Sequence, residues 1–507
     1  MKIANLEIKG ITSDSKAVKK GFVFVAIKGA RQDGRRFIQD AIANGASIVV
    51  AEKEKREIEI PEKVKLLQVN DCRKFLAEAC AEFYHHPSGK INPSIPRSKD
   101  RGMLRIDTES GVFFPRPQGR GLNAAERIKV VGITGTNGKT TVSYLIEAIA
   151  KKAGYACGVI GTVNYRFKDK KIAAKNTTPG PGQLQELLSK MFKQRIKYCA
   201  MEVSSHALDQ KRVAGVNFTH AIFTNLTHDH LDYHKNLESY FQAKAGLFRA
   251  LPDTSVAIIN NDDQYSRRLK QLTRAKLITY GIKNKADFLA RDIKFSISGS
   301  RFRLSSPQIK AKIKTSLVGE YNIYNILAAI AWGISENFDF RDIQSAIENF
   351  KTVPGRLEKV LGRKGCNVFV DYAHTPDALF NVITALRPLV SRKIIVIFGC
   401  GGERDKFKRP KMGEIVTRLA DYAIITSDNP RSEDPLRIIR DICAGICKNN
   451  FRVIPDRFKA IQAGLRLAEK DDCLIITGKG HENYQILKNK VLFFSDRKAV
   501  QKCLGLM

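Results

Sequence analysis

The sequence predicts an α/β protein of three domains, each built as a sheet flanked by helices. Its 507 residues correspond to about three domains of ordinary size. A hydrophobic content of 43% is enough to form several cores. Along most of the chain, short apolar runs rich in β-branched residues alternate with helical patterns, as in parallel sheets covered by helices.

The first expected domain covers residues 1–90 and is followed by a segment of different composition. The strands expected in it are 22–27 and 47–50. Asp71 is a good N-cap residue, and a helix is expected to run from it to Phe83. Residues 91–127 are rich in Pro, Gly and Arg and show no helical or strand periodicity. We therefore expect an inserted flexible linker there, with a basic partner-binding segment as the alternative.

Two further domains are expected over residues 128–352 and 353–507. The strands expected in the first of them are 128–131, 198–200, 221–227 and 256–260. Those expected in the second are 368–374, 394–399, 423–426 and 474–478. Helical stretches separate these runs, which is typical of open parallel sheets.

The bulk composition narrows the choice of function. The net charge of +35 suggests an anionic partner, and nucleic acid is the first to consider. Lys and Arg are spread along the chain among acidic residues, however, so we expect a site for anionic small molecules and no nucleic acid. No apolar run is long enough for a membrane-spanning helix, and the first residues lack a signal-peptide core. Ten scattered cysteines fit free thiols in a reducing cytoplasm.

A glycine-rich stretch at residues 132–141 is the most informative motif. It follows a β-branched run and precedes a helical pattern that Gly154 would end. A strand, a glycine-rich turn and a helix together form a phosphate cradle, to which Lys139 adds a charge and the threonines add hydroxyls for magnesium. The spacing departs from the standard P-loop, because Gly132 lies one residue too far from Gly138. The alternative is a glycine-rich turn without a ligand.

Acidic and histidine residues follow two of the expected strands. Glu202 could offer magnesium a carboxylate beside the phosphate loop. His230 lies in a segment, 228–234, that crowds histidine and aspartate residues, and it could serve a second metal. A structural histidine and a zinc site are the alternatives, but no His/Cys quartet with zinc spacing occurs.

Several polar loops stand next to expected strands. In the first domain these are the turns 12–15 and 29–34; in the last they are 399–405, 428–431 and 478–482. The three loops of the last domain could face one crevice, where arginines would bind carboxylates and a glutamate would bind an amine. That combination favours a small zwitterion with an extra charged end. Ordinary turn chemistry is the alternative for each loop.

These motifs together resemble the ATP-dependent Mur ligases of peptidoglycan precursor synthesis. The string Thr-Gly-Thr-Asn-Gly-Lys-Thr-Thr at 134–141 is similar to the variant phosphate loop of that family, which accounts for its spacing. The resemblance covers nearly all of the chain except residues 91–126. Asp-Asn-Pro-Arg at 428–431 is similar to the form found in the members that add meso-diaminopimelate as the third peptide residue, and lysine-adding members differ there.

The resemblance implies a set of site residues. For ATP these are Gly135, Thr136, Asn137, Gly138, Lys139, Thr140, Thr141, Asn322, Arg356 and Asp371. For the UDP-muramoyl-dipeptide they are Ser15, Ala30, Arg31, Gln32, Asn176, Thr177, Thr178, Ser204, Gln210 and Arg212. For diaminopimelate they are Arg404, Asp428, Asn429, Pro430, Arg431, Gly478 and Glu482. The catalytic residues would be Lys139, Glu202, His230 and Lys244, the last carbamylated to N6-carboxylysine. The magnesium ligands would be Thr140, Glu202, His230 and the carbamylated Lys244.

The resemblance also implies the reaction. ATP would convert the D-glutamate carboxylate of UDP-N-acetylmuramoyl-L-alanyl-D-glutamate into an acyl phosphate, which the amine of diaminopimelate would attack. We expect one substrate per domain, Mg²⁺ as cofactor, closure of the last domain over the intermediate, and a cytoplasmic monomer without stable membrane insertion. The alternatives are a folylpolyglutamate synthase, a lysine-adding relative, and a basic binding protein whose phosphate loop is vestigial.

Overall fold

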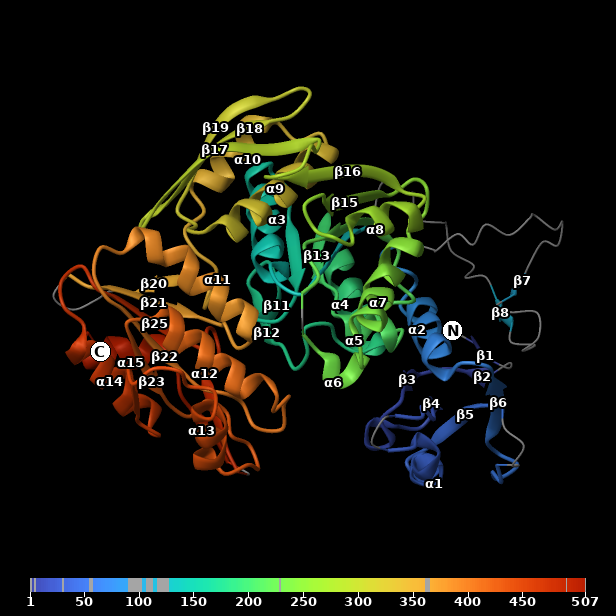
Figure 1. Cartoon of the computed structure of the whole chain (residues 1–507). Helices are drawn as coiled ribbons and strands as arrows, with labels where there is room; N and C mark the ends of the chain where they lie inside the picture. Colours follow the sequence, from blue (N-terminus) through green and yellow to red (C-terminus); the bar gives the residue numbers. More distant parts are fainter. Residues whose placement is uncertain are drawn as a thin grey trace.

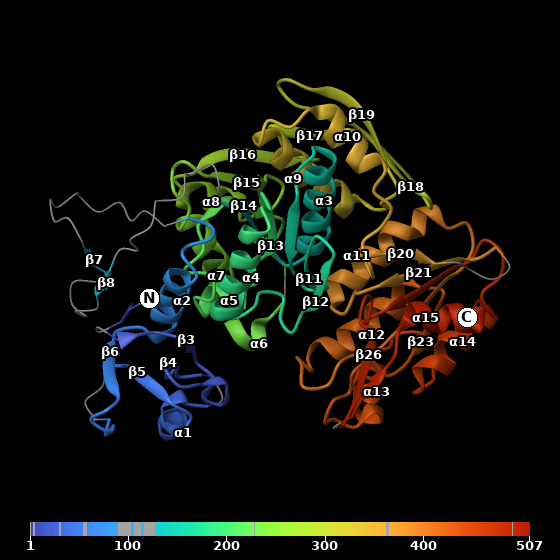
Figure 2. The same cartoon turned by 180° about the vertical axis from the view of Figure 1, so that it is seen from behind.

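The structure is a computed structural model that describes residues 2–3, 6–29, 32–53, 58–89, 103–105, 113–115, 127–227, 229–360, 365–488 and 490–506. In these residues, three sheets carry helices on their faces and lie one after another along the chain (Figures 1 and 2). The predicted α/β class is therefore confirmed. We refer to the three parts as the N-terminal, central and C-terminal units, after their sheets.

The N-terminal unit is built on a four-stranded parallel sheet. Its strands, in spatial order, are β3 (Gly10–Thr12), β4 (Phe22–Val25), β5 (Ala46–Glu52) and β6 (Lys65–Val69). Its helices are η1 (Ser15–Ala17), η2 (Gly34–Phe37), α1 (Ile38–Ala43) and α2 (Cys72–Phe83), and β1 (Lys2–Ile3) pairs with β2 (Leu6–Glu7). Asp71 caps α2 as predicted, because its carboxylate accepts the Lys74 N–H at 2.9 Å.

The central unit holds an 11-stranded sheet. In spatial order its strands are β12 (Lys170–Ala173), β11 (Asn164–Phe167), β10 (Cys157–Ile160), β13 (Tyr198–Glu202), β9 (Lys129–Thr134), β14 (Phe218–Phe223), β15 (Val256–Asn260), β16 (Lys276–Gly281), β17 (Phe288–Ser296), β18 (Gly299–Ser305) and β19 (Lys310–Thr315). The strands from β10 to β17 are parallel, and antiparallel pairs extend both edges. The phosphate loop follows β9, near the middle of the parallel part.

Helices cover both faces of the central sheet. They are α3 (Lys139–Lys152), α4 (Pro181–Lys193), α5 (Ser205–Asp209), α6 (Leu231–His234), α7 (Leu237–Arg249), α8 (Ser266–Leu272), α9 (Glu320–Ser335) and α10 (Phe340–Glu348). One core lies between the sheet and α3, α9 and α10, and a second lies between the sheet and α4 and α7. Because apolar side chains cover both faces, the parallel strands read as continuous hydrophobic runs.

One predicted strand of the central unit ends early. A strand was expected over 221–227, but β14 ends at Phe223. The next residues leave the sheet because they bond to the phosphate loop. Thr224 Oγ1 donates to the Asn137 carbonyl at 2.6 Å, and the Thr227 N–H donates to Thr136 Oγ1 at 3.0 Å.

The C-terminal unit holds a six-stranded sheet. In spatial order its strands are β20 (Glu358–Val360), β21 (Asn367–Asp371), β25 (Cys473–Thr477), β22 (Ile394–Phe398), β23 (Tyr422–Ile425) and β24 (Phe451–Val453), all parallel except β20. Its helices are α11 (Pro376–Leu386), η4 (Arg387–Leu389), α12 (Lys408–Leu419), α13 (Pro435–Cys443), α14 (Arg457–Leu467) and α15 (Asp496–Cys503), and β26 (Tyr484–Leu487) pairs with β27 (Lys490–Phe493). Strand β21 ends at Asp371 and not at His374 as expected, because the Asp371 carboxylate turns the chain by accepting the Ala373 N–H at 2.7 Å.

The segment predicted to be a linker contains two short strands. β7 (Met103–Arg105) and β8 (Phe113–Pro115) pair antiparallel, although the sequence of this segment shows no strand periodicity. The rest of residues 90–126 lies outside the described residues.

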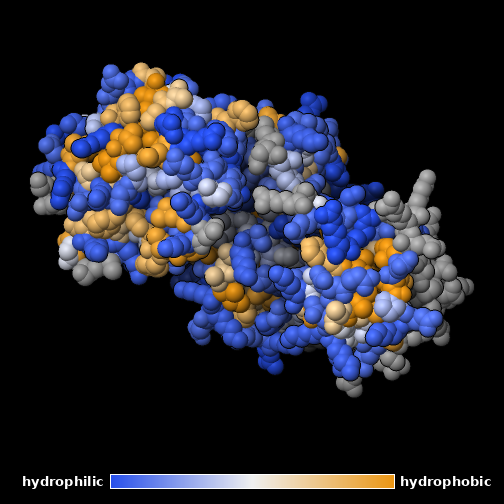
Figure 3. Space-filling model, turned by 90° about the horizontal axis from the view of Figure 1, so that it is seen from below, coloured by the Kyte–Doolittle hydropathy of each residue, from blue (hydrophilic) through white to orange (hydrophobic). Residues whose placement is uncertain are grey.

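Seen from below, the surface is hollowed between the N-terminal and C-terminal units, and hydrophobic residues form separate patches among hydrophilic ones (Figure 3). None of the helices in the described ranges is long and apolar enough to cross a membrane. All ten cysteines carry free thiols.

Candidate active site

The predicted phosphate loop lies between β9 and α3 and depends on two glycines. Gly135 has a φ of +151° and Gly138 a φ of +89°. A Cβ atom at Gly135 would lie 1.9 Å from Thr224 Oγ1, and one at Gly138 would lie 2.4 Å from Asn325 Oδ1. Glycine is therefore required at both positions. Gly138 is the N-cap of α3, and no side chain caps that helix, so its first N–H groups are left to bind an anion.

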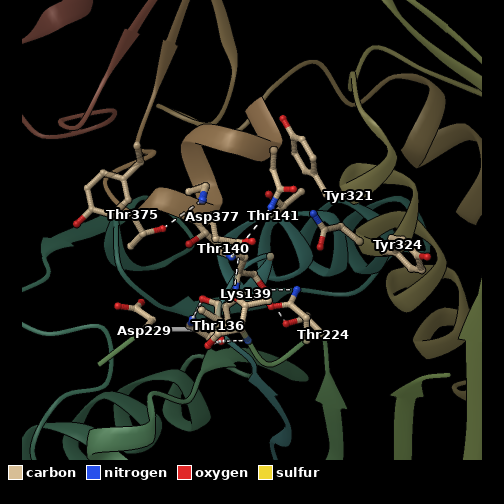
Figure 4. A pocket seen from close by; sticks show the side chains of 18 of the residues that line it. Thr136, Lys139, Thr140, Thr141, Thr224, Asp229, Tyr321, Tyr324, Thr375 and Asp377 are labelled. Carbon is tan, nitrogen blue, oxygen red and sulfur yellow. Dashed lines mark hydrogen bonds between the residues drawn. The ribbon is translucent and has the colours of Figure 1, made fainter. Parts of the chain in front are cut away.

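Two lysines, the half-buried Lys139 and the fully buried Lys244, converge on this loop. Lys139 Nζ donates to the carbonyls of Gly135 and Thr136, each at 2.8 Å. Lys244, on α7, is 1% exposed and donates to the Gly135 carbonyl at 2.8 Å. Burial lowers the pKa of Lys139, and burial together with the neighbouring Lys139 holds the pKa of Lys244 well below its usual range. Both Nζ atoms lie against the Gly135 carbonyl at the base of the cradle, where Figure 4 shows Lys139.

Glu202, at the end of β13, brings a carboxylate to the same place. Its oxygens accept hydrogen bonds from Thr140 Oγ1 at 3.0 Å, from the Thr162 N–H at 3.0 Å and from Thr162 Oγ1 at 2.8 Å. The side chain is buried. A carboxylate and a threonine hydroxyl next to a phosphate cradle are the hard oxygen donors that Mg²⁺ prefers, so these residues fit the predicted metal.

His230 lines the same cavity as Glu202 and has a strained backbone. Its φ is +54°, and its Nε2 is 3.5 Å from Asp229 Oδ2. The imidazole is 46% exposed, yet desolvation by the surrounding protein lowers its pKa to about 4, so it is neutral near pH 7 and keeps a lone pair for a metal. In the described ranges, no three His, Cys, Asp or Glu side chains gather as a ready-made metal site. The predicted ligand set would rely on the Thr140 hydroxyl and on a modified Lys244 as well.

A cavity of about 510 Å³ opens over the loop. The predicted residues that line it are Thr136, Asn137, Gly138, Lys139, Thr140, Thr141, Thr177, Glu202, Ser204, His230, Lys244, Asn322, Arg356 and Asp371. Gly135 is not among them; it is buried, and its carbonyl accepts hydrogen bonds from Lys139 and Lys244. Two of the lining residues are held by neighbours: Asn322 Nδ2 donates to the Val318 carbonyl at 2.8 Å, and the Asp371 carboxylate accepts two backbone N–H groups.

The C-terminal unit closes one side of this cavity. Arg356 Nη2 donates to Thr140 Oγ1 at 3.2 Å, and its guanidinium stacks on Tyr372 at 4.5 Å. Asp377 Oδ2, at the start of α11, accepts Asn137 Nδ2 at 3.0 Å and Thr227 Oγ1 at 3.2 Å. Figure 4 shows Asp377 and Thr375 facing the phosphate loop from the helix of the other unit.

The sequence did not single out Asp377, Thr162 or Thr227 as site residues. For Asp377 a signal existed, because Thr-Pro-Asp at 375–377 is a typical helix start. Thr375 caps α11 by accepting the Ala378 N–H at 3.2 Å, and Pro376 occupies the first turn. Ligands of α/β proteins often bind where a helix begins just after the end of a strand. Thr162 and Thr227 stand in loops without such a pattern.

The residues predicted for the muramoyl-dipeptide form one network beside Glu202. Thr178 Oγ1 donates to the Glu202 carbonyl at 2.8 Å and accepts the Ser204 N–H at 3.0 Å. Arg212 Nη1 donates to the Thr178 carbonyl at 3.1 Å, and Arg212 Nε donates to Gln210 Oε1 at 2.9 Å. Two further members are Thr177, whose hydroxyl is 3.1 Å from that of Thr162, and Asn176, whose carbonyl accepts Tyr165 Oη at 2.5 Å.

The residues predicted for the UDP end lie in the N-terminal unit. Ser15 is buried at the start of η1, where its carbonyl accepts Asn44 Nδ2 at 3.0 Å. The Gln32 carbonyl accepts the Gly29 N–H at 2.9 Å. Ala30 and Arg31 lie outside the described residues.

In the C-terminal unit, the three loops after β22, β23 and β25 meet. The Gly402 N–H donates to the Asn429 carbonyl at 2.9 Å, and Asn429 Nδ2 donates to Glu482 Oε2 at 2.8 Å. Arg431, with a φ of +54°, donates through Nη1 to the Gly402 carbonyl at 2.6 Å. The same loops carry four other predicted residues, which are Arg404, Asp428, Pro430 and Gly478. A Cβ atom at Gly478 would lie 2.5 Å from Asp428 Oδ2, so this position also requires glycine.

Comparison with known proteins matches all three units. The Mur ligase family catalytic domain matches residues 7–84, the Mur ligase middle domain matches 133–333, and the Mur ligase glutamate ligase domain matches 355–480. The UDP-N-acetylmuramoyl-L-alanyl-D-glutamate--2,6-diaminopimelate ligase of Clostridium botulinum is 38% identical over 500 residues, which cover 98% of this chain and 95% of that protein. The ligase of the same name from Bacillus velezensis is 40% identical over 504 residues, covering 98% and 94%.

A solved structure agrees. A UDP-N-acetylmuramoyl-L-alanyl-D-glutamate--2,6-diaminopimelate ligase structure superposes with a TM-score of 0.65 at 30% identity, covering 99% of this chain and 97% of that one. The predicted resemblance is confirmed, and the chain belongs to the Mur ligase family.

Proposed function

We propose that the chain is an ATP-dependent ligase that joins meso-diaminopimelate to UDP-N-acetylmuramoyl-L-alanyl-D-glutamate. The proposal depends mainly on one observation: the same cavity is lined by the phosphate loop, by Glu202, and by Thr177 and Ser204, which are expected to bind the muramoyl-dipeptide. The substrate identities are supported by relatives of that name that are 38–40% identical along almost the whole chain. We further propose that the enzyme works in the cytoplasm as a monomer.

The reaction has to turn a carboxylate into an electrophile. A carboxylate oxygen of D-glutamate attacks the γ-phosphorus of ATP, the bond to the β,γ-bridging oxygen breaks, and ADP leaves. The positive charge of Lys139 and the first N–H groups of α3 would offset the charge on the transferring phosphoryl group. The product of this step is an acyl phosphate.

The amine then replaces phosphate. A neutral amino group of diaminopimelate attacks the acyl carbon, and the tetrahedral intermediate expels phosphate while the nitrogen loses a proton. Water would destroy the acyl phosphate, so the contacts of Asp377 and Arg356 with the loop support a closed arrangement during this step.

The metal would be held by residues next to the loop. Thr140 and Glu202 would hold Mg²⁺, which when bound neutralises phosphate charge. His230 and Lys244 would complete the ligand set. Burial lowers the pKa of the Lys244 amine well below its usual range and so favours the neutral form, whose nitrogen can add to CO₂, forming a C–N bond and releasing a proton. The carbamate would offer anionic oxygens to the metal, which the protonated amine would repel.

Phosphate release from ATP tests the proposal. The purified chain is incubated with ATP, Mg²⁺ and UDP-N-acetylmuramoyl-L-alanyl-D-glutamate, and with meso-diaminopimelate, L-lysine or no amino acid. We expect sustained release with diaminopimelate alone. Release with lysine and none with diaminopimelate would overturn the substrate assignment. The variant Glu202→Gln should lose about 100-fold or more in kcat, as expected for removal of a charged group near the transferring phosphoryl group. The matched control Glu186→Gln, on the exposed side of α4, should keep full activity.

A further inference from the structure

Lys479 is a fully buried cation that none of the reaction steps above uses. It lies in the loop between β25 and β26, within Gly478-Lys479-Gly480-His481-Glu482, and its side chain is 0% exposed. A lysine at such depth needs charged or polar partners to offset the loss of hydration. Its partners therefore indicate what the residue does.

The Lys479 ammonium lies between two carboxylates of the predicted amino-acid site. Its Nζ is 3.3 Å from Glu482 Oε2 and 3.6 Å from Asp428 Oδ1. Both carboxylates are themselves largely buried, with side chains 14% and 7% exposed. Without the Lys479 ammonium, the two carboxylates would repel each other, and one of them would take up a proton. The Lys479 ammonium favours the ionised form of both carboxylates, and the two acids together still lack one positive charge.

Lys479 also fixes the orientation of an amide. Its Nζ donates to Asn429 Oδ1 at 3.0 Å, and the Ile486 N–H donates to the same oxygen at 3.0 Å. With Oδ1 held in this way, the Asn429 NH₂ group points to Glu482 Oε2, 2.8 Å away. Loss of the ammonium would remove one of the two donors that decide which end of the amide faces Glu482.

Two other fully buried cations in the described part of this unit have partners of their own. Arg457 donates two hydrogen bonds of 2.7 Å to Asp496, and Arg409 pairs with Glu433 at 3.0 Å and with Asp441 at 2.8 Å. Burial and the nearby Asp428 raise the pKa of Glu482, whereas Lys479 lowers it. Both observations agree that Lys479 is the counter-ion of the carboxylate pair.

We propose that Lys479 is a positioning residue for the incoming amino acid. It keeps both carboxylates of the Asp428–Glu482 pair ionised and holds Asn429 and Glu482 in place, so that the pair accepts one ammonium group. That ammonium is the one that does not react, because the attacking amine must be neutral. The inference rests on the proposed function. It goes beyond it because the preference for an amino acid with a second ammonium group is assigned to a residue that need not touch the substrate.

The test compares two substrates that differ by one amino group. Values of kcat/KM are measured by phosphate release with meso-diaminopimelate and with 2-aminopimelate, which lacks one ammonium. The wild type should prefer diaminopimelate by about 100-fold, the effect expected when a buried charged group loses its partner. In Lys479→Gln, which keeps hydrogen-bond donors but not the charge, the preference should fall to about tenfold or less, while the KM for ATP stays unchanged. The control Lys459→Gln, on the exposed side of α14, should behave as the wild type.

The outcomes separate the two proposals. A wild type that releases no phosphate with diaminopimelate would overturn the proposed function and this inference with it. An active wild type whose preference is unchanged in Lys479→Gln would overturn the inference alone. If the glutamine variant does not fold, Lys479→Met, whose unbranched side chain fits the same space, is measured in its place. If neither variant folds, Lys479 has a purely structural role and the inference is wrong.

Discussion

Arg457 and Asp496 form a fully buried ion pair that ties α14 to α15. Both side chains are 0% exposed. Arg457 Nε and Nη2 donate to the two carboxylate oxygens at 2.7 Å, and Nη2 also donates to the Thr477 carbonyl at 2.8 Å. The variant Asp496→Asn keeps the shape of the side chain and removes its charge. It leaves the guanidinium buried without a counter-ion.

The expected cost follows from this burial. Removing one partner of a buried pair destabilises a protein by about 3–5 kcal/mol. For a unit of this size, about 1 kcal/mol lowers Tm by roughly 2–4 °C, so the C-terminal unit should melt about 6–20 °C lower. The double variant Arg457→Met/Asp496→Leu removes both charges and should recover most of the loss.

Two optical signals separate the units during unfolding. The single tryptophan, Trp332, is buried in α9 of the central unit, so its fluorescence reports that unit, whereas far-UV circular dichroism reports the whole chain. We expect Asp496→Asn to shift part of the dichroism transition and to leave the Trp332 transition in place. The half-exposed pair Arg392–Glu469 provides the control, because Glu469→Gln should cost less than about 1 kcal/mol. An Asp496→Asn variant within about 1 kcal/mol of the wild type would refute the reasoning.

Three further predictions follow from single contacts. Burial lowers the pKa of His220 to about 4, from 6.5 in the unfolded chain, so the unfolded state binds more protons between these values and stability falls as the pH drops through them. His220 contributes at most about 1.4 kcal/mol to the unfolding free energy per pH unit. Urea titrations at several pH values should therefore show a weaker dependence of the unfolding free energy on pH in His220→Gln than in the wild type. An equal dependence in both proteins would contradict this. Arg301 faces Lys294 and Lys314 on the two neighbouring strands, so Arg301→Glu should stabilise the protein by about 0.2–1 kcal/mol in thermal melts, and a lower Tm would count against it. Asp377→Ala removes the bonds between α11 and the phosphate loop and should increase the radius of gyration in X-ray scattering; an unchanged profile would show that other contacts hold the units together.

The central elements of the fold were readable because their patterns are local. The apolar run before the phosphate loop, the glycines within it and the helical spacing after it predict β9, the loop and α3 without reference to the rest of the chain. The alternation of charged and apolar residues in Arg301-Phe302-Arg303-Leu304 is also a local signal, and it marks β18, which was not among the expected strands. Strand ends were less predictable. β14 stops at Phe223 only because Thr224 and Thr227 bond to a loop about 90 residues earlier in the chain.

The sequence by itself determined the chemistry of this protein. The phosphate loop and the Asp-Asn-Pro-Arg string are contiguous motifs that carry their residue types at fixed spacing, and Glu202 ends a recognisable strand. These local signals are enough to predict a ligase and its family. Only the tertiary structure decided which of these residues come together in the site and which are occupied by structural hydrogen bonds. It placed Asp377 of one unit on Asn137 of another, turned the Asp371 carboxylate toward backbone N–H groups, and buried Lys479 between two acids. Such contacts join residues far apart in the sequence, and their strength depends on burial, which the order of residues along the chain does not contain.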